Sequence, residues 1–357
     1  MENKNTALVV GATGITGSNL TQELISQGWT TYGLSRNPNN ALEGLIPIKA
    51  DLLDVKSLES ALEGISPTHV YFTTWMRNDT EEENIRVNST LVRNLLDVLS
   101  LKKSVQHVAL VTGLKHYLGP FEAYAKEGKL PVTPVREEHP RLPLPNFYYA
   151  QEDEVYKASE RDGFTWSVHR PHTVVGYAIG NLMNIASTLA VYASICKETG
   201  RKFIWPGSFE QWNGISDATD ARILAKQLVW ASTTESAKNT AFNIANGDVF
   251  RWKWLWQRLA DWFRIEAVGF EDQIKPLEKE MENDQEIWDN IAQKYQLKEE
   301  NLNRLSSAWH TDLDLGRPLE VMCDMTNSRN LGFSEYQNTE RSFLDVFEKL
   351  RAEKIIP

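Results

Sequence analysis

A glycine-rich turn between a strand and a helix lies close to the start of the chain, in "TALVVGATGITGSNLTQELI" (residues 6–25). Gly11, Gly14 and Gly17 form a G-x-x-G-x-x-G pattern there. In this setting the glycines allow a tight turn, a close backbone approach to a pyrophosphate and close packing of helix on strand. The free N–H groups of the helix N-terminus then favour an anion. The segment predicts the first βαβ unit of a dinucleotide-binding sheet.

Short β-branched runs alternate with helical patterns over the first two-thirds of the chain. The segments expected to be strands are "TALVVG", "TTYGLS", "IPIKAD", "THVYFTT", "HVALVTG" and "TWSVHRP". This alternation is typical of a parallel sheet with helices on both faces. We therefore predict an α/β fold, a Rossmann-type doubly wound parallel sheet over residues 1–180. One further strand is expected near 240–246, in "NTAFNIANGD".

The character of the sequence changes after about Gly180. Most of the tryptophans follow residue 200, four of them in "RWKWLWQRLADW" (residues 251–262). These rings are expected either to fill a helical core or to line a large apolar pocket. Residues 271–308 are charged and predict a solvated helix pair. We expect residues 181–357 to form a smaller, mainly helical substrate lobe that is interleaved with the Rossmann core.

Charge and cysteine content narrow the class of protein. The formal net charge of -10 disfavours nucleic acids and anionic membranes, since both attract basic surfaces. Two cysteines, Cys196 and Cys323, are too few for a disulfide framework. The N-terminus lacks a signal-peptide pattern, and no apolar run is long enough to span a bilayer. We expect a cytoplasmic protein without a metal site, because no cluster of metal ligands has usable spacing. A homodimer is left open.

The end of the second expected strand indicates which nicotinamide cofactor is bound. An NAD site usually has an acid there, whereas this strand ends in Ser35 and Arg36. A guanidinium suits a 2′-phosphate, which predicts NADPH (NADP), unless Arg36 is simply a surface residue. Asp51 and Leu52 are expected at the adenine edge, and Thr74 with Trp75 at the cofactor's rim.

The segment "NFYYAQED" (residues 146–153) has two tyrosines, each followed four residues later by an acid. A catalytic Tyr-x-x-x-Lys pair on one helix would place a lysine, instead of an acid, four residues after the tyrosine. Lys115, just past the fifth expected strand in "LVTGLKHYLGPF", can reach the same space from another loop, because strand ends meet at one edge. No serine that could hold a carbonyl stands near Lys115.

With these segments, the chain resembles the progesterone 5β-reductase and iridoid synthase-like enoate reductases, a divergent branch of the extended short-chain dehydrogenases/reductases. The resemblance is carried by "GATGITG", the Ser-Arg pair, "TGLKHYLGPFE", "NFYYAQED", "TWSVHRP" and the C-terminal "NSRNLGFSEYQNTERSFLDVFEKLRAEKIIP". It covers nearly the whole chain. There are departures from the family pattern: His172 stands where a small residue is expected, and the aromatic segment after Trp252 is richer than expected.

The resemblance implies catalytic roles for Lys115 and Tyr148, with Tyr149 as the competing choice. It implies that His116 is structural. The implied cofactor-binding positions are Gly11, Thr13, Gly14, Ile15, Thr16, Gly17, Ser35, Arg36, Asp51, Leu52, Thr74, Trp75, Val111, Tyr148, Val174, Asn181, Leu182 and Met183.

The activity that the resemblance implies is NADPH-dependent reduction of the C=C bond of a small hydrophobic enone or enal. Two alternatives stay open at this point. One is a carbonyl (1,2) reductase or epimerase on the same fold. The other is a non-enzymatic NADP-binding redox sensor, which the retention of both Lys115 and Tyr148 disfavours.

Overall fold

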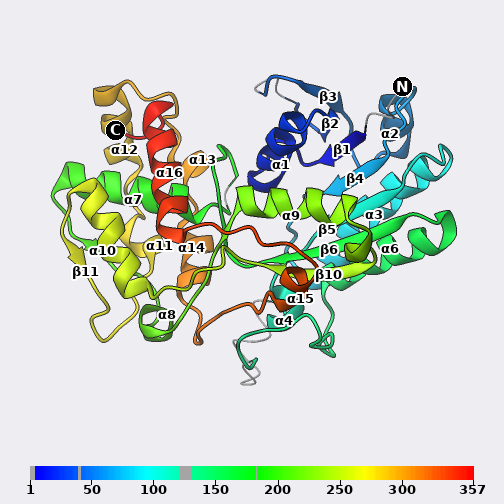
Figure 1. Cartoon of the computed structure of the whole chain (residues 1–357). Coiled ribbons are helices and arrows are strands. Elements are labelled where there is room, and N and C mark those ends of the chain that lie inside the picture. Colours follow the sequence, from blue (N-terminus) through cyan, green and yellow to red (C-terminus); the bar gives the residue numbers. More distant parts are fainter. Residues whose placement is uncertain (1–4, 39–41, 121–130, 182) are drawn as a thin grey trace.

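The computed structural model describes residues 5–38, 42–120, 131–181 and 183–357. Its centre is a seven-stranded parallel sheet in the order β10-β6-β5-β4-β1-β2-β3 (Figure 1). The strands are β1 (Thr6–Val10), β2 (Thr30–Ser35), β3 (Leu45–Lys49), β4 (His69–Phe72), β5 (His107–Val111), β6 (Thr165–Pro171) and β10 (Thr240–Ile244). All six segments expected to be strands, and the additional later one, are confirmed.

Helices cover both faces of the sheet. On one face α1 (Ile15–Ser26) and α9 (Ala221–Thr233) pack side by side over an apolar layer. On the other lie α2 (Val55–Ala61), α3 (Glu81–Ser100) and α6 (Phe147–Asp162). Chain order reverses between β1 and β4, so the carboxyl ends of these two strands flank the crevice where such folds bind ligands.

The second lobe is mainly helical. It contains α7 (Ile185–Thr199), α8 (Phe209–Asn213), α10 (Trp252–Phe263), α11 (Leu277–Glu280), α12 (Gln285–Tyr295), α13 (Leu302–Leu305), α14 (Ala308–Leu315) and α16 (Thr339–Ala352). Two short parallel pairs accompany these helices: β8 (Phe203–Ile204) with β11 (Ala267–Val268), and β7 (Val174–Val175) with β9 (Thr219–Asp220). None of the helices within the described ranges is long and apolar enough to cross a membrane.

The chain passes between core and lobe several times. After α7 and α8 it returns to the core for α9 and β10 (Figure 1). It enters the lobe again for α10 to α14, and then α15 (Thr326–Asn330) packs beside β10. The last helix, α16, lies in the lobe against α7 and α10. Both parts are therefore built from segments that alternate along the sequence.

The tryptophan-rich segment forms one continuous helix, α10, and supplies the lobe's core. Trp252 and Trp256 are buried, and the Trp256 ring stacks on Phe203 with centroids 3.9 Å apart. Trp254, on the opposite side of the helix, is 47% exposed. Of the two roles expected for these rings, the packing is that of a core.

The charged segment 271–308 differs from the expected helix pair. It contains the three short helices α11, α12 and α13 and the beginning of α14. Helix α12 stops because Gln296 adopts a left-handed conformation (φ 55°), and Asn301 then caps the N-terminus of α13.

Candidate active site

The glycine loop brings β1 and the start of α1 close together. Gly11 has φ +85°, and a Cβ built on it would lie 2.8 Å from Thr74 Cβ. A Cβ on Gly17 would lie 2.1 Å from the Gly11 carbonyl oxygen, so only glycine fits there. The first turn of α1 contains no acid, and its N–H groups have no intrahelical partner. This cradle fits a pyrophosphate.

The end of β2 carries an unsatisfied hydroxyl. The Ser35 Oγ is buried and has no hydrogen-bond partner among the residues that the structure describes. Arg36 follows at once, and its side chain is exposed. Beyond β3, Leu52 is buried, while the exposed Asp51 accepts a hydrogen bond from the Leu53 N–H at 2.9 Å. A phosphate on the adenosine ribose would find a guanidinium and a hydroxyl at this edge.

Of the other expected cofactor residues, Asn181 and Val174 lie beside the glycine loop. The Asn181 side-chain nitrogen would be 3.5 Å from a Cβ on Gly14. Val174 packs with Ile15 in a small apolar cluster. Val111 ends β5, Trp75 follows β4, and Met183 is 41% exposed. Thr13 and Thr16 belong to the loop and to the first turn of α1. Leu182 lies outside the described residues.

Tyr148 is the second residue of α6 and lies at the carboxyl edge of the sheet. The residue is 7% exposed, and a Cβ built on Gly113 would be 3.5 Å from its hydroxyl oxygen. Within the described ranges this hydroxyl has no hydrogen-bond partner. The phenol is therefore available to a ligand at the end of β5.

Tyr149 points its hydroxyl elsewhere. The group donates to the His116 carbonyl oxygen at 2.5 Å and accepts from the Leu142 N–H at 3.0 Å. Both hydrogen-bonding capacities are used by backbone. Of the two tyrosines, Tyr149 is therefore the one whose hydroxyl has a structural role.

Lys115 begins the short helix α4 (Lys115–Leu118) directly after β5. Its Nζ lies 5.0 Å from the Trp75 ring centroid and 5.1 Å from that of Phe147. The Phe147 and Tyr148 ring centroids are 4.3 Å apart. The structure thus brings Lys115, Tyr148 and Trp75, expected from different segments, to the same edge of the sheet.

The surroundings keep Tyr148 protonated. Burial raises the pKa of its phenol, and the negative charge of Glu81 raises it further. A phenol with a raised pKa serves as a hydrogen-bond donor and is a poor base near neutral pH. The Glu81 carboxylate, at the start of α3, also accepts the Phe147 N–H at 2.7 Å.

The acid four residues beyond Tyr148 takes part in a group of ion pairs. Glu152 is 1% exposed and lies 2.8 Å from Arg141, 3.6 Å from Arg170 and 3.8 Å from His116. Burial alone would raise the pKa of Glu152, but these partners hold it below its usual value. Asp153 pairs with Arg141 at 2.7 Å. Glu152 and Asp153 therefore help to hold α6 in place through ion pairs.

Several residues near the site had not been expected there. The Arg77 guanidinium lies 3.6 Å from the Trp309 ring centroid. This contact joins the segment after β4 to α14 of the lobe. Burial, then the charge of Arg77, lowers the pKa of His310 to about 4, and Lys115 contributes in the same direction. Glu81 and Gly113 were missed as well. Their proximity to Tyr148 comes from strand and helix packing, for which the local sequence carries no signal.

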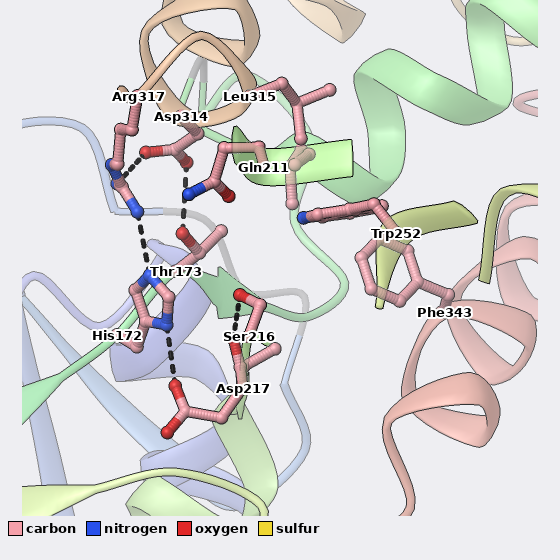
Figure 2. Close-up of a pocket in the computed structure, with 12 residues that line it drawn as sticks. His172, Thr173, Gln211, Ser216, Asp217, Trp252, Asp314, Leu315, Arg317 and Phe343 are labelled. Carbon is pink, nitrogen blue, oxygen red and sulfur yellow. Dashed lines mark hydrogen bonds and ion pairs between the residues drawn. The ribbon is translucent and has the colours of Figure 1, made fainter. Parts of the chain in front are cut away.

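His172 follows β6 and belongs to a buried chain of polar contacts beside a narrow cavity (Figure 2). Its Nδ1 lies 2.7 Å from Asp217 Oδ1, and its Nε2 lies 2.7 Å from an Arg317 nitrogen. Arg317 also pairs with Asp314. Because arginine only donates, Nε2 accepts and Nδ1 carries the proton that is donated to Asp217. Through these contacts His172 links the end of β6 to the lobe.

Comparison with curated proteins gives close relatives over the full length. The chain is 37% identical over 367 residues to a 3-oxo-Delta(4,5)-steroid 5-beta-reductase of Arabidopsis thaliana, covering 99% of this chain and 94% of the relative. It is 38% identical over 368 residues to an (S)-8-oxocitronellyl enol synthase of Camptotheca acuminata, with the same coverage.

Two solved structures have the same fold at low sequence identity to this chain. A UDP-glucose 4-epimerase from Thermotoga maritima has a TM-score of 0.68 at 13% identity, covering 97% of this chain and 99% of that one. The Bordetella bronchiseptica enzyme WbmG, in complex with NAD, has a TM-score of 0.67 at 14% identity, covering 99% and 96%. At these identities the likeness concerns the fold alone.

Residues 53–357 match the family model of the PRISE-like Rossmann-fold domain. Together with the full-length relatives, this match confirms the resemblance that the motifs indicate. The chain belongs to the PRISE-like Rossmann-fold family, the oxidoreductases related to steroid 5β-reductase and 8-oxocitronellyl enol synthase.

Proposed function

We propose that this enzyme reduces the C=C bond of hydrophobic enones and enals with NADPH. The observation that carries the proposal is the state of Tyr148. Its hydroxyl is unpaired among the described residues, its pKa is raised, and it faces a glycine. That arrangement suits an oxyanion donor.

The residues present fit a dinucleotide with a 2′-phosphate. The loop from Gly11 to Gly17 would hold the pyrophosphate, and Ser35 with Arg36 the 2′-phosphate. Asn181 and Val174 lie beside the loop and would contact the cofactor. When bound, the reduced nicotinamide supplies the hydride. Thr74 and Trp75, at the exit of β4, would border its ring.

The chemistry assigned to the protein's own groups is stabilisation of an enolate. Addition of a hydride to the β-carbon pushes the C=C electrons toward the carbonyl oxygen. The Tyr148 hydroxyl donates a hydrogen bond to that oxygen, and the Lys115 ammonium adds positive charge nearby. Protonation of the α-carbon from water then gives the saturated ketone or aldehyde.

The relatives support this substrate class. A 3-oxo-Delta(4,5)-steroid has a carbonyl conjugated with a C=C bond, and it is named as the substrate of the Arabidopsis relative. We propose that the present enzyme likewise acts on a small, uncharged enone or enal in the cytoplasm, without nucleic acid, membrane or metal. A homodimer is compatible with this function.

A carbonyl (1,2) reductase or epimerase is the alternative on this fold. Such enzymes use a serine to hold a carbonyl or hydroxyl beside the tyrosine, and Gly113 supplies no hydroxyl at the end of β5. The second alternative, a redox sensor, needs no unpaired phenol. Both alternatives are therefore less well supported than C=C reduction.

The test is a product analysis. The full chain would be incubated with NADPH and, separately, 2-cyclohexen-1-one, cyclohexanone and UDP-glucose, and the products identified by mass spectrometry. We expect cyclohexanone from the enone, with one NADPH consumed per product. An allylic alcohol as the main enone product, or turnover of the sugar nucleotide in place of the enone, would overturn the proposal.

A further inference from the structure

One side chain contacts the backbone of both residues to which we assign the chemistry. Asn146 precedes α6 and is 4% exposed. Its Oδ1 accepts a hydrogen bond from the Tyr148 N–H at 3.0 Å. Its Nδ2 donates to the Lys115 carbonyl oxygen at 2.8 Å.

The helix that carries Lys115 needs such an anchor. When a tyrosine and a lysine lie four residues apart in one helix, the helix itself sets their separation. Here Lys115 begins α4, which has only four residues, and Tyr148 belongs to α6. A single helical turn is unstable on its own, because fixing its dihedrals gains very few hydrogen bonds. The position of α4 must therefore come from tertiary contacts.

The start of α6 is itself held in place. The Glu81 carboxylate, on α3, accepts the Phe147 N–H at 2.7 Å. The Tyr149 hydroxyl adds a second bond from α6 to α4, at the His116 carbonyl oxygen. Among these side chains, Asn146 is the one that contacts both Lys115 and Tyr148.

We propose that Asn146 is a positioning residue that holds Lys115 in register with Tyr148. This inference rests on the proposed function. The amide suits the role because one group both accepts at the helix cap and donates to a carbonyl oxygen. Serine at this position would keep the cap but would be too short to donate to Lys115. Aspartate would also keep the cap but would turn a second acceptor toward the carbonyl oxygen.

The first experiment compares Asn146→Ser with Asn338→Ser in the full chain. Asn338 caps α16 in the lobe by accepting the Arg341 N–H at 2.9 Å, so both variants lose an amide and keep a cap. With NADPH and 2-cyclohexen-1-one, Asn146→Ser should lower kcat about tenfold, the order expected when one hydrogen bond that orients a catalytic group is lost. Its Kd for NADPH and its KM should stay within about twofold, and Asn338→Ser should retain the unmutated kcat. If Asn146→Ser does not fold, Asn146→Asp is measured in its place.

A double-mutant cycle identifies the residue through which Asn146 acts. If Asn146 works by placing Lys115, adding Asn146→Ser to Lys115→Met should change kcat by less than about twofold. Losses that multiply would mean independent effects and would overturn the inference, as would an unmutated kcat in Asn146→Ser.

Hydrogen exchange separates this inference from the proposed function. Without any substrate, Asn146→Ser should speed amide exchange in residues 114–119, and Asn338→Ser should not. If the unmutated protein reduces no enone, the proposed function fails, whereas faster exchange at α4 would still support the anchoring. Unchanged exchange at α4 would overturn the inference whatever the activity.

Discussion

The hydroxyl of Tyr148 faces Gly113, so closely that a Cβ built on Gly113 would lie 3.5 Å from the phenol oxygen. The same Cβ would be 3.4 Å from the Pro171 carbonyl oxygen, which is ordinary van der Waals contact. An added Cβ therefore fits at this position without displacing the backbone. In the proposed mechanism, the glycine leaves the phenol as the group that meets a substrate oxygen at the end of β5.

Gly113→Ser should fold normally and reduce enones more slowly. The new hydroxyl would compete with the substrate oxygen for the Tyr148 proton, at a cost of about one hydrogen bond, or roughly tenfold in kcat. Gly113→Ala is the matched control, and its kcat should fall less than that of the serine variant. Equal rates for the two variants would show that the hydroxyl is not the cause.

Tyr148→Phe removes the proposed oxyanion donor and should lower kcat by about 10²-fold or more. Its melting temperature should hardly change, because the hydroxyl has no hydrogen-bond partner among the described residues. Tyr149→Phe removes two hydrogen bonds to backbone, so it should lower stability by about 1–3 kcal/mol and reduce kcat far less. Steady-state kinetics and thermal unfolding of both variants would reveal the opposite pattern if Tyr149 were the donor.

The pH dependence of kcat should be flat from about pH 7 to 9.5. The pKa of Tyr148 is raised by burial and by Glu81, so the phenol stays protonated below its ordinary value of 10.0. Initial rates at saturating NADPH and enone test this expectation. A rate that rises with pH around neutrality would instead indicate a tyrosinate acting as a base.

NADPH should be preferred to NADH by about tenfold to a hundredfold in kcat/KM. A charge-assisted contact to the 2′-phosphate is worth roughly 1.5–3 kcal/mol, and we propose that Arg36 and Ser35 make it. Arg36→Asp should erase or invert the preference. Arg161, at the end of α6, is exposed and provides a control substitution. Equal KM values for both cofactors in the unmutated enzyme would contradict the assignment.

Stability should fall as the pH drops below about 6.5. Burial lowers the pKa of His169, in β6, to about 4, and its side chain is fully buried. The unfolded chain binds a proton near the ordinary value of 6.5. The native state therefore binds fewer protons between these values, and its stability, fully present above 6.5, is lost as the pH falls toward 4. The loss from His169 is on the order of 3 kcal/mol.

Urea unfolding at pH 7.5 and 5.0 measures the part of this loss that falls above pH 5.0, about 2 kcal/mol. His169→Gln should be less stable at pH 7.5, because it disturbs bonds to Ser167 and Gln227. Its free energy of unfolding should, however, fall less on acidification than that of the unmutated protein. An identical loss in both proteins would assign the pH dependence to other groups.

Local patterns were sufficient to predict the sheet. Most expected strands are apolar runs that become buried in a parallel ladder, with the edge strand β3 the more exposed exception, and such runs can be recognised one at a time. The glycine loop was readable for the same reason, since its constraints lie within seven residues. The helices of the charged segment 271–308 were harder to predict. Their ends lie at left-handed and capping residues, for which the sequence preferences are weak.

The roles of the two tyrosines could not be separated by local patterns. Tyr148 and Tyr149 are adjacent in the sequence, and only the rotation of α6 decides which one faces Gly113 and which one faces α4. Glu81 lies 66 positions from the Phe147 N–H that it accepts. Such contacts depend on how α3, α4 and α6 pack, and packing is set by the whole core.

The repeated passage of the chain between core and lobe has a consequence for dissecting the protein. A fragment that ends near Gly180 would lack β10, the edge strand beside β6, and α9, the neighbour of α1. The complementary fragment would carry those two elements with no sheet to receive them. Neither piece is a folding unit, so separate expression should yield unfolded polypeptides, and mixing the two pieces is the arrangement from which a native assembly could be recovered.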